Sequence, residues 1–186
     1  DYLDGGAGDD YLQGDAGDDV LLGGADNDTL YGDDSTLTVQ QGDDWLSGGS
    51  GNDKLYGGGG NDTLDGGADN DLLVGDFTND PIGGGDWING GNGDDTLIGG
   101  QGEDVLFGGG DQDVLFGNEG QDVLDGGGGS DELQGGTEAD MLWGGTENDR
   151  LFGEEGDDQL FGDSGSDELF GEAGADLLVG GRGADT

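Results

Sequence analysis

Carboxylates at a fixed spacing are the residues of this chain that could do chemistry. Twenty aspartates, from Asp1 to Asp185, lie on one nine-residue lattice once two interruptions are removed, and each is followed two residues later by Leu or Ile wherever the chain continues. Carboxylate oxygens are hard ligands that suit calcium, whereas zinc favours His and Cys, which the chain lacks. The spacing therefore predicts a long series of equivalent cation sites.

The lattice belongs to a nine-residue unit, G-G-x-G-x-D-x-U-x, in which U is a large aliphatic residue. It runs unbroken through ten copies from Gly90 to Val179, and three unbroken copies each cover Gly5 to Tyr31 and Gly48 to Val74. We predict that the metal ligands are the aspartates at position six: Asp10, Asp19, Asp28, Asp44, Asp53, Asp62, Asp71, Asp86, Asp95, Asp104, Asp113, Asp122, Asp131, Asp140, Asp149, Asp158, Asp167 and Asp176.

Departures from the unit identify the weakest loops. Position one is Gly in every copy that contains it, and position six is always Asp, but position four becomes Asp or Glu in five copies. Asp tolerates the left-handed backbone that Gly supplies, and Glu does so less readily. We expect the loops at Glu138 and Glu147 to be the least favourable sites.

Copies such as GGAGDDYLQ at Gly5 and GGSGNDKLY at Gly48 resemble the RTX (repeats-in-toxin) nonapeptide, a calcium-binding repeat of secreted bacterial adhesins, toxins and proteases. The resemblance covers essentially the whole chain. It implies an all-β fold, a right-handed parallel β-roll (β-solenoid) with two short-strand sheets and calcium-binding loops. In that fold two nonapeptides make one turn, and each repeat shares an ion with the repeat after next. About twenty repeats would then hold roughly 14–18 calcium ions.

The residues themselves support a stacked fold. A Gly-rich turn of six residues can aim carbonyls at an ion, and x-U-x makes a short strand with U inward and its neighbours outward. One such strand cannot bury its apolar side alone, so the copies must stack. A net charge of -43 and 50 glycines in 186 residues would otherwise indicate disorder. We therefore predict that the metal-free chain is unfolded and that calcium folds it.

We expect one repeat domain over residues 1–186, interrupted by loop insertions near 34–40 and 77–82. Removing the two insertions restores the nonapeptide, and they lie four repeats apart, so both should emerge on the same flank. Each is followed by a Trp at position seven, Trp45 and Trp87, facing outward on one sheet. Either the Trp packs against its own insertion, or the pair forms a platform for a ligand.

Position nine predicts an outer apolar stripe on one sheet. On alternate repeats it reads Gln13, Tyr31, Tyr56, Val74, Ile98, Phe116, Gln134, Phe152 and Phe170. Such a patch either covers a thin sheet or contacts another chain. We expect self-association or docking of a neighbouring domain through this stripe.

Other classes of function fit poorly. The chain has no His, no Cys and no catalytic motif, so we predict no enzyme in this segment. Three basic residues against 46 acidic ones exclude a nucleic-acid footprint. Neither a signal peptide nor a membrane span is present, and both ends stop in mid-repeat, so we expect a segment of a longer protein.

Two functions remain open. The first is a calcium-binding module that folds on calcium after secretion and acts as a structural or adhesive extender of an extracellular protein. The alternative is the C-terminal tail for secretion and folding of a secreted enzyme or toxin. Extracellular calcium suits sites that load at about 10⁻⁴ to 10⁻³ M, which predicts an extracellular location, the cell surface included. The resemblance implies one-step (type I) secretion.

Overall fold

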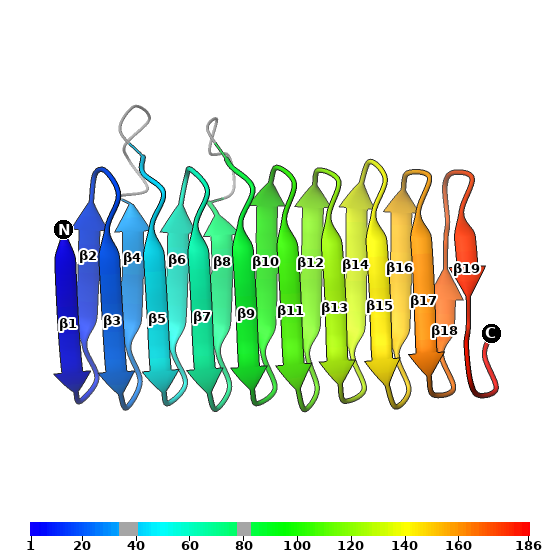
Figure 1. The fold of residues 1–186 in the computed structure, drawn as a ribbon, viewed down its shortest axis with the longest axis horizontal. Coiled ribbons are helices and arrows are strands. Elements are labelled where there is room, and N and C mark those ends of the chain that lie inside the picture. The colour runs from blue at the N-terminus through cyan, green and yellow to red at the C-terminus, as the bar shows by residue number, and fades with distance from the viewer. Residues whose placement is uncertain (34–40, 78–82) are drawn as a thin grey trace.

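A computed structural model describes residues 1–33, 41–77 and 83–186, and within these residues the fold is all-β. Two parallel sheets, one of ten strands and one of nine, run along the long axis of the molecule (Figure 1). Strands alternate between the sheets along the chain, so two strands make one turn of a β-solenoid. This confirms the predicted β-roll.

Odd-numbered strands form the first sheet and even-numbered strands form the second. The first sheet contains β1 (Tyr2–Ala7), β3 (Val20–Ala25), β5 (Trp45–Ser50), β7 (Thr63–Ala68), β9 (Trp87–Asn92), β11 (Val105–Gly110), β13 (Val123–Gly128), β15 (Met141–Thr146), β17 (Gln159–Ser164) and β19 (Leu177–Val179). The second contains β2 (Tyr11–Asp15), β4 (Thr29–Asp33), β6 (Lys54–Gly58), β8 (Leu72–Asp76), β10 (Thr96–Gln101), β12 (Val114–Glu119), β14 (Glu132–Thr137), β16 (Arg150–Glu155) and β18 (Glu168–Phe170).

The pairing register reproduces the repeat. Uninterrupted turns pair residues 18 positions apart, as in Leu106 with Leu124. Across residues 34–40 the offset grows by seven residues, pairing Val20 with Trp45. Across residues 77–82 it grows by six, pairing Thr63 with Trp87. Each insertion therefore leaves the register of the strands beside it unchanged.

A single column of aliphatic side chains from both sheets fills the core. The position-eight residues from Leu21 to Leu160 are fully buried at 0 % exposure, and Leu169 is 7 % exposed. The column thins at its ends, where Leu3 and Leu12 are only partly buried and Leu178 is 44 % exposed. Each Leu is covered by its neighbours in adjacent turns and by the facing sheet, as expected for a stack of repeats.

The strands are longer than the three residues predicted from x-U-x. Most extend through positions one to three of the next repeat, because these residues also pair with the adjacent turn, as Gly24 does with Gly6 and Ala25 with Ala7. Position two has a positive φ, 115° at Gly24 and 75° at Asp15, which bends the strand toward the turn. The turns are correspondingly shorter than six residues.

The two tryptophans lie where the sequence places them. Trp45 in β5 and Trp87 in β9 are 43 % and 42 % exposed on the outer face of the odd-numbered sheet. The first insertion lies outside the described residues, and so does the second beyond Phe77. The Phe77 ring stacks on Tyr56, at 6.2 Å between centroids, on the outer face of the other sheet. Whether either Trp packs against its insertion stays a prediction.

Candidate metal site

Each position-six aspartate stands at the end of a turn, directly before a strand. Its backbone carbonyl accepts a hydrogen bond from the next turn on both flanks: the N–H of Val114 donates to the carbonyl of Asp95 at 2.9 Å, and the N–H of Val123 donates to that of Asp104 at 2.9 Å. Because odd and even repeats turn on opposite flanks, the aspartates form two columns, one along each flank of the roll.

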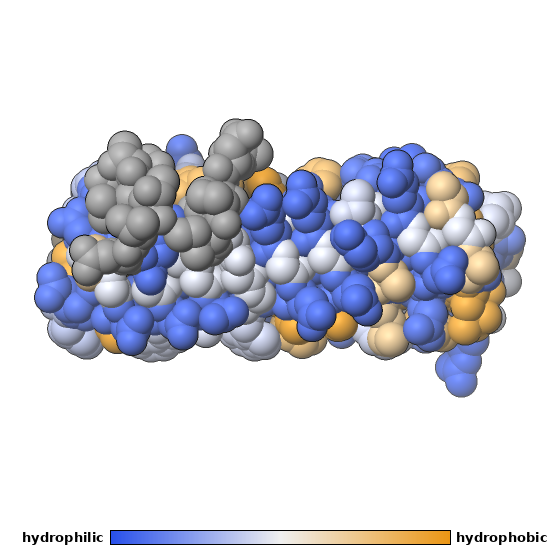
Figure 2. All heavy atoms as spheres, turned by 90° about the horizontal axis from the view of Figure 1, so that it is seen from above, coloured by the Kyte–Doolittle hydropathy of each residue, from blue (hydrophilic) through white to orange (hydrophobic). Residues whose placement is uncertain are grey.

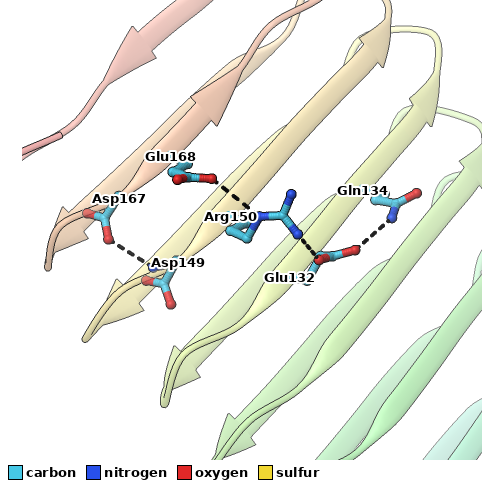
Figure 3. A network of polar contacts seen from close by, with 6 residues as sticks. All are labelled: Glu132, Gln134, Asp149, Arg150, Asp167 and Glu168. Carbon is cyan, nitrogen blue, oxygen red and sulfur yellow. Dashed lines mark hydrogen bonds and ion pairs between the residues drawn. The ribbon is translucent and has the colours of Figure 1, made fainter. Parts of the chain in front are cut away.

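One carboxylate oxygen links successive turns. The N–H of Asp95 donates to Oδ1 of Asp113 at 2.8 Å, and the N–H of Asp113 donates to Oδ1 of Asp131 at 2.9 Å. The same bond recurs through both columns, for example from the N–H of Asp149 to Oδ1 of Asp167 at 3.0 Å (Figure 3). Each aspartate from Asp28 onward is thereby held in one orientation, with Oδ1 already engaged.

The second oxygen, Oδ2, is buried and has no hydrogen-bond partner within the described part of the chain. This holds for Asp10, Asp19, Asp28, Asp44, Asp53, Asp62, Asp71, Asp86, Asp95, Asp104, Asp113, Asp122, Asp131, Asp140, Asp149, Asp158 and Asp167. Leaving a buried charged oxygen without a partner costs about 1–3 kcal/mol or more. Two continuous columns of such atoms indicate a ligand that bonds to oxygen.

The glycine at position one has no Cβ, and this leaves room beside Oδ2 of the aspartate. A Cβ added to Gly108 would lie 2.5 Å from Oδ2 of Asp113 and 2.7 Å from the carbonyl oxygen of Gly126 in the next turn. Any side chain here would therefore overlap oxygens from two successive turns. This explains in packing terms why position one is Gly in every copy.

Burial raises the pKa of these carboxyl groups, and neighbouring carboxylates raise it further. The pKa of Asp113 rises to about 8 through burial, despite the hydrogen bond from Asp95, with Asp95 and Asp131 adding repulsion. Burial also raises the pKa of Asp86 to about 9 and that of Asp62 to about 8. At neutral pH the turns therefore need either protons or a cation to offset the buried charge.

The donor set suits a hard cation. Among the described residues, no three His, Cys, Asp or Glu side chains gather at one point, so backbone carbonyls would have to complete any coordination sphere. Oxygen-only ligands in a Gly-rich turn fit calcium, whereas zinc favours nitrogen and sulfur. Calcium bound here would supply the positive charge that the buried carboxylates lack.

The loops expected to be weakest keep the common geometry. Glu138 and Glu147 have φ of 72° and 81°, and Asp140 and Asp149 are 2 % and 1 % exposed. Oε2 of Glu138 accepts the N–H of Gly120 from the preceding turn at 3.0 Å, a contact that a glycine could not make. Among the predicted ligands Asp10 and Asp176 differ in burial: their repeats lie near the two ends of the stack, and both are half-buried.

Sequence reasoning missed a second ladder at position five. The N–H of Asn52 donates to Oδ1 of Asn27 at 2.8 Å, and the N–H of Asn70 donates to Oδ1 of Asn52 at 3.1 Å. These side chains are exposed. The opposite flank, seen in Figure 2, carries the same ladder, in which the N–H of Asn61 donates to Oδ1 of Asp43 at 2.9 Å, and its described surface is largely hydrophilic. The frequent Asp, Asn and Ser at position five is the signal that could have revealed this ladder, because short polar side chains commonly accept backbone N–H groups.

The described part of the chain contains no helix long and apolar enough to cross a membrane. A family model described as the RTX calcium-binding nonapeptide repeat (4 copies) matches residues 1–35, 39–73, 82–115, 101–133, 134–169 and 152–186. A search of curated proteins found no match.

Proposed function

Because this chain belongs to the RTX calcium-binding nonapeptide repeat family, we propose that it is a module that folds when calcium enters its two columns of turns. The observation that supports this is the buried Oδ2 of seventeen position-six aspartates, from Asp10 to Asp167, which has no hydrogen-bond partner among the described residues. Each column needs positive charge between its turns, and the rest of the chain offers only three basic residues. We propose 14–18 ions, with Asp176 as the outermost ligand.

The proposed setting is extracellular. A chain of net charge -43 with a core one residue wide should stay unfolded where calcium is scarce and fold where it reaches about 10⁻³ M. This behaviour suits secretion in an unfolded state followed by folding outside the cell. The proposed role there is structural or adhesive: a rod that extends a larger protein and makes contacts through its outer apolar stripe.

A second candidate is the C-terminal repeat tail of a secreted enzyme or toxin. The uninterrupted ten copies from Gly90 to Val179 favour the extender, since a folding tag needs fewer repeats. The test is to express the chain with the sequence that flanks it: further repeats would support the extender, and a catalytic domain would support the tail.

Circular dichroism tests the calcium dependence. In a chelator at pH 7.5 we expect no strand signal, and in about 10 mM calcium a cooperative gain of strand, because metal binding and folding are coupled. Magnesium is the control and should be much weaker, since it dehydrates reluctantly and demands stricter geometry. A full strand signal in the chelator would refute the proposal.

Lowering the pH in the chelator gives a second arm of the same test. In the folded chain the pKa of Asp86 is raised to about 9 and that of Asp113 to about 8, whereas an Asp in the unfolded chain has a pKa of about 4. Between pH 4 and pH 8 to 9 the folded chain therefore binds more protons than the unfolded chain. Metal-free stability is therefore greatest at low pH and falls as pH rises toward 8 or 9. We expect strand signal without calcium to grow as pH is lowered from 8 to 5, and calcium affinity to fall over the same range.

A further inference from the structure

The outer face of the even-numbered sheet is neutral in an otherwise acidic molecule. Among its outward positions seven and nine, the charged residues are Lys54, Glu132, Arg150 and Glu168, two cations and two anions. The same positions of the odd-numbered sheet carry Asp4, Asp65 and Asp125 and no cation. For a chain of net charge -43, the neutral face is the one on which two copies can approach with least repulsion.

This face also carries a continuous row of rings at its N-terminal half. Tyr11 and Tyr31 lie 5.5 Å apart, Tyr31 and Tyr56 stack at 4.7 Å, and Tyr56 stacks with Phe77 at 6.2 Å between centroids. Tyr11 is 66 % exposed. Apolar rings held in register along a sheet form a contact surface that loses little conformational entropy when it is covered.

The face is hollowed over β10, beside Phe77 and Ile98, and again in its C-terminal half. A hollow between β12 and β14 is lined by Phe116, Gln134 and Thr137, at the point where Gln134 interrupts the apolar stripe. Beyond it, Arg150 bonds to Glu132 at 2.6 Å and to Glu168 at 3.4 Å across three strands (Figure 3), and its guanidinium lies 5.1 Å from the Phe152 ring centroid. The two halves thus differ in shape.

We propose that the even-numbered sheet pairs face to face with the same sheet of a second copy, the two rolls running in opposite directions. The two-fold axis would lie between the sheets, parallel to the strands, and pass over β10. This proposal rests on the proposed function, because calcium must first fold the sheet. A two-fold interface uses the same surface on both copies, so its two halves must complement each other.

The order of the strands makes the two halves of this face complement each other. In the sequence β18-β16-β14-β12-β10-β8-β6-β4-β2, reversal about β10 sets β6 opposite β14 and β8 opposite β12. Lys54 in β6 then faces the partner's Glu132 in β14, and this pair occurs twice. The stacked rings of Tyr56 and Phe77, which we call the aromatic ridge, then face the hollow beside Phe116 and Gln134. Charge and shape match in the same arrangement.

Rolls running in the same direction would lose both matches. Reversal of the strands about the long axis would set β6 against β6 and β14 against β14, so the aromatic ridge would meet a ridge and the hollow would meet a hollow. In that arrangement position seven of each strand would face position nine of the same strand in the partner, so Lys54 would have no opposite charge across the interface. Exposed ion pairs contribute little affinity by themselves, so the pair selects the direction while the apolar stripe supplies most of the binding.

Cross-linking of single cysteines reads out the direction directly, because the natural chain has no Cys. Ile98 in β10 faces its own copy across the axis, so Ile98→Cys should form covalent dimers with a short bismaleimide in calcium. Phe116→Cys alone should not, whereas a mixture of Phe116→Cys and Val74→Cys should, since β12 faces β8. The antiparallel arrangement would be overturned if Phe116→Cys alone formed cross-linked dimers as efficiently as Ile98→Cys.

Charge reversal gives an independent measurement by analytical ultracentrifugation in calcium. Lys54→Glu should weaken the dimer about tenfold or more, because two attractive pairs become repulsive. The double variant Lys54→Glu with Glu132→Lys should recover most of the loss. Thr63→Glu, a new carboxylate on the outer face of the other sheet, is the control and should leave the dimer unchanged.

Calcium-induced circular dichroism of every variant separates the two proposals. If the wild-type chain folds in calcium but remains a monomer at high concentration, the dimer is refuted and the calcium module stands. If the wild-type chain does not fold in calcium, the module itself is refuted. A dimer unaffected by Lys54→Glu would also overturn the pairing of β6 with β14.

Discussion

The middle of the roll and its C-terminal end carry the same nonapeptide in different surroundings. In the middle, Leu115 is fully buried and Asp113 is 1 % exposed. At the end, Leu178 occupies the equivalent position and is 44 % exposed, and the hydrogen bond onto Asp185 is 3.3 Å long, against 2.8 Å onto Asp113. A repeat therefore becomes a buried site only when a turn lies on each side of it, as nearest-neighbour coupling requires.

The largest expected difference concerns the core. Leu115→Ala should lower the free energy of unfolding in calcium by about 2–5 kcal/mol, because it opens a cavity between two turns that cannot collapse. Leu178→Ala should cost less than about 1 kcal/mol, since the side chain is already half in water. Urea unfolding of both variants in saturating calcium measures the loss of unfolding free energy. Equal losses for the two variants would contradict the difference between the middle and the end of the roll.

The glycine beside the carboxylate should show a smaller effect. Gly108→Ala places a Cβ 2.5 Å from Oδ2 of Asp113 and 2.7 Å from the carbonyl oxygen of Gly126, so we expect a loss of about 1–3 kcal/mol. Gly110→Ala in the same turn is the matched control, because its Cβ would meet nothing within 4 Å. We expect that control to stay within about 0.5 kcal/mol of wild type.

If Gly110→Ala were as damaging as Gly108→Ala in thermal unfolding, backbone freedom rather than the oxygen-lined space would explain glycine at position one. That result would remove the packing argument for the metal site.

Neutralising one ligand should be the mildest change. Asp113→Asn keeps the acceptor for the N–H of Asp95 but removes charge from two neighbouring sites, so the calcium midpoint should rise by roughly tenfold. Asp185→Asn should shift it less than about twofold, because few turns depend on it. Calcium titrations followed by circular dichroism compare them, and equal shifts would contradict the coupling of neighbouring turns.

Much of the architecture could be read from the residues. The phase of Asp and Leu predicted an inward aliphatic column and insertions that leave the repeat in phase, because these follow from a period of nine and from strand alternation. Two strands per turn were expected from the resemblance to the RTX repeat. The pairing offset is 25 between Val20 and Trp45 and 24 between Thr63 and Trp87, against 18 between Leu106 and Leu124. The strand length was underestimated, because pairing of positions one to three depends on the adjacent turn.

The sequence by itself determined which atoms could bind a cation and how often they recur, because composition and period belong to the chain alone. Only the tertiary structure decided that Oδ1 of an aspartate such as Asp113 accepts an N–H from the adjacent turn, while its buried Oδ2 has no hydrogen-bond partner among the described residues. It also decided that both strand cations, Lys54 and Arg150, share one sheet face with the aromatic ridge. These contacts and shared surfaces involve residues from different turns, and only the stacking of the turns brings those residues together.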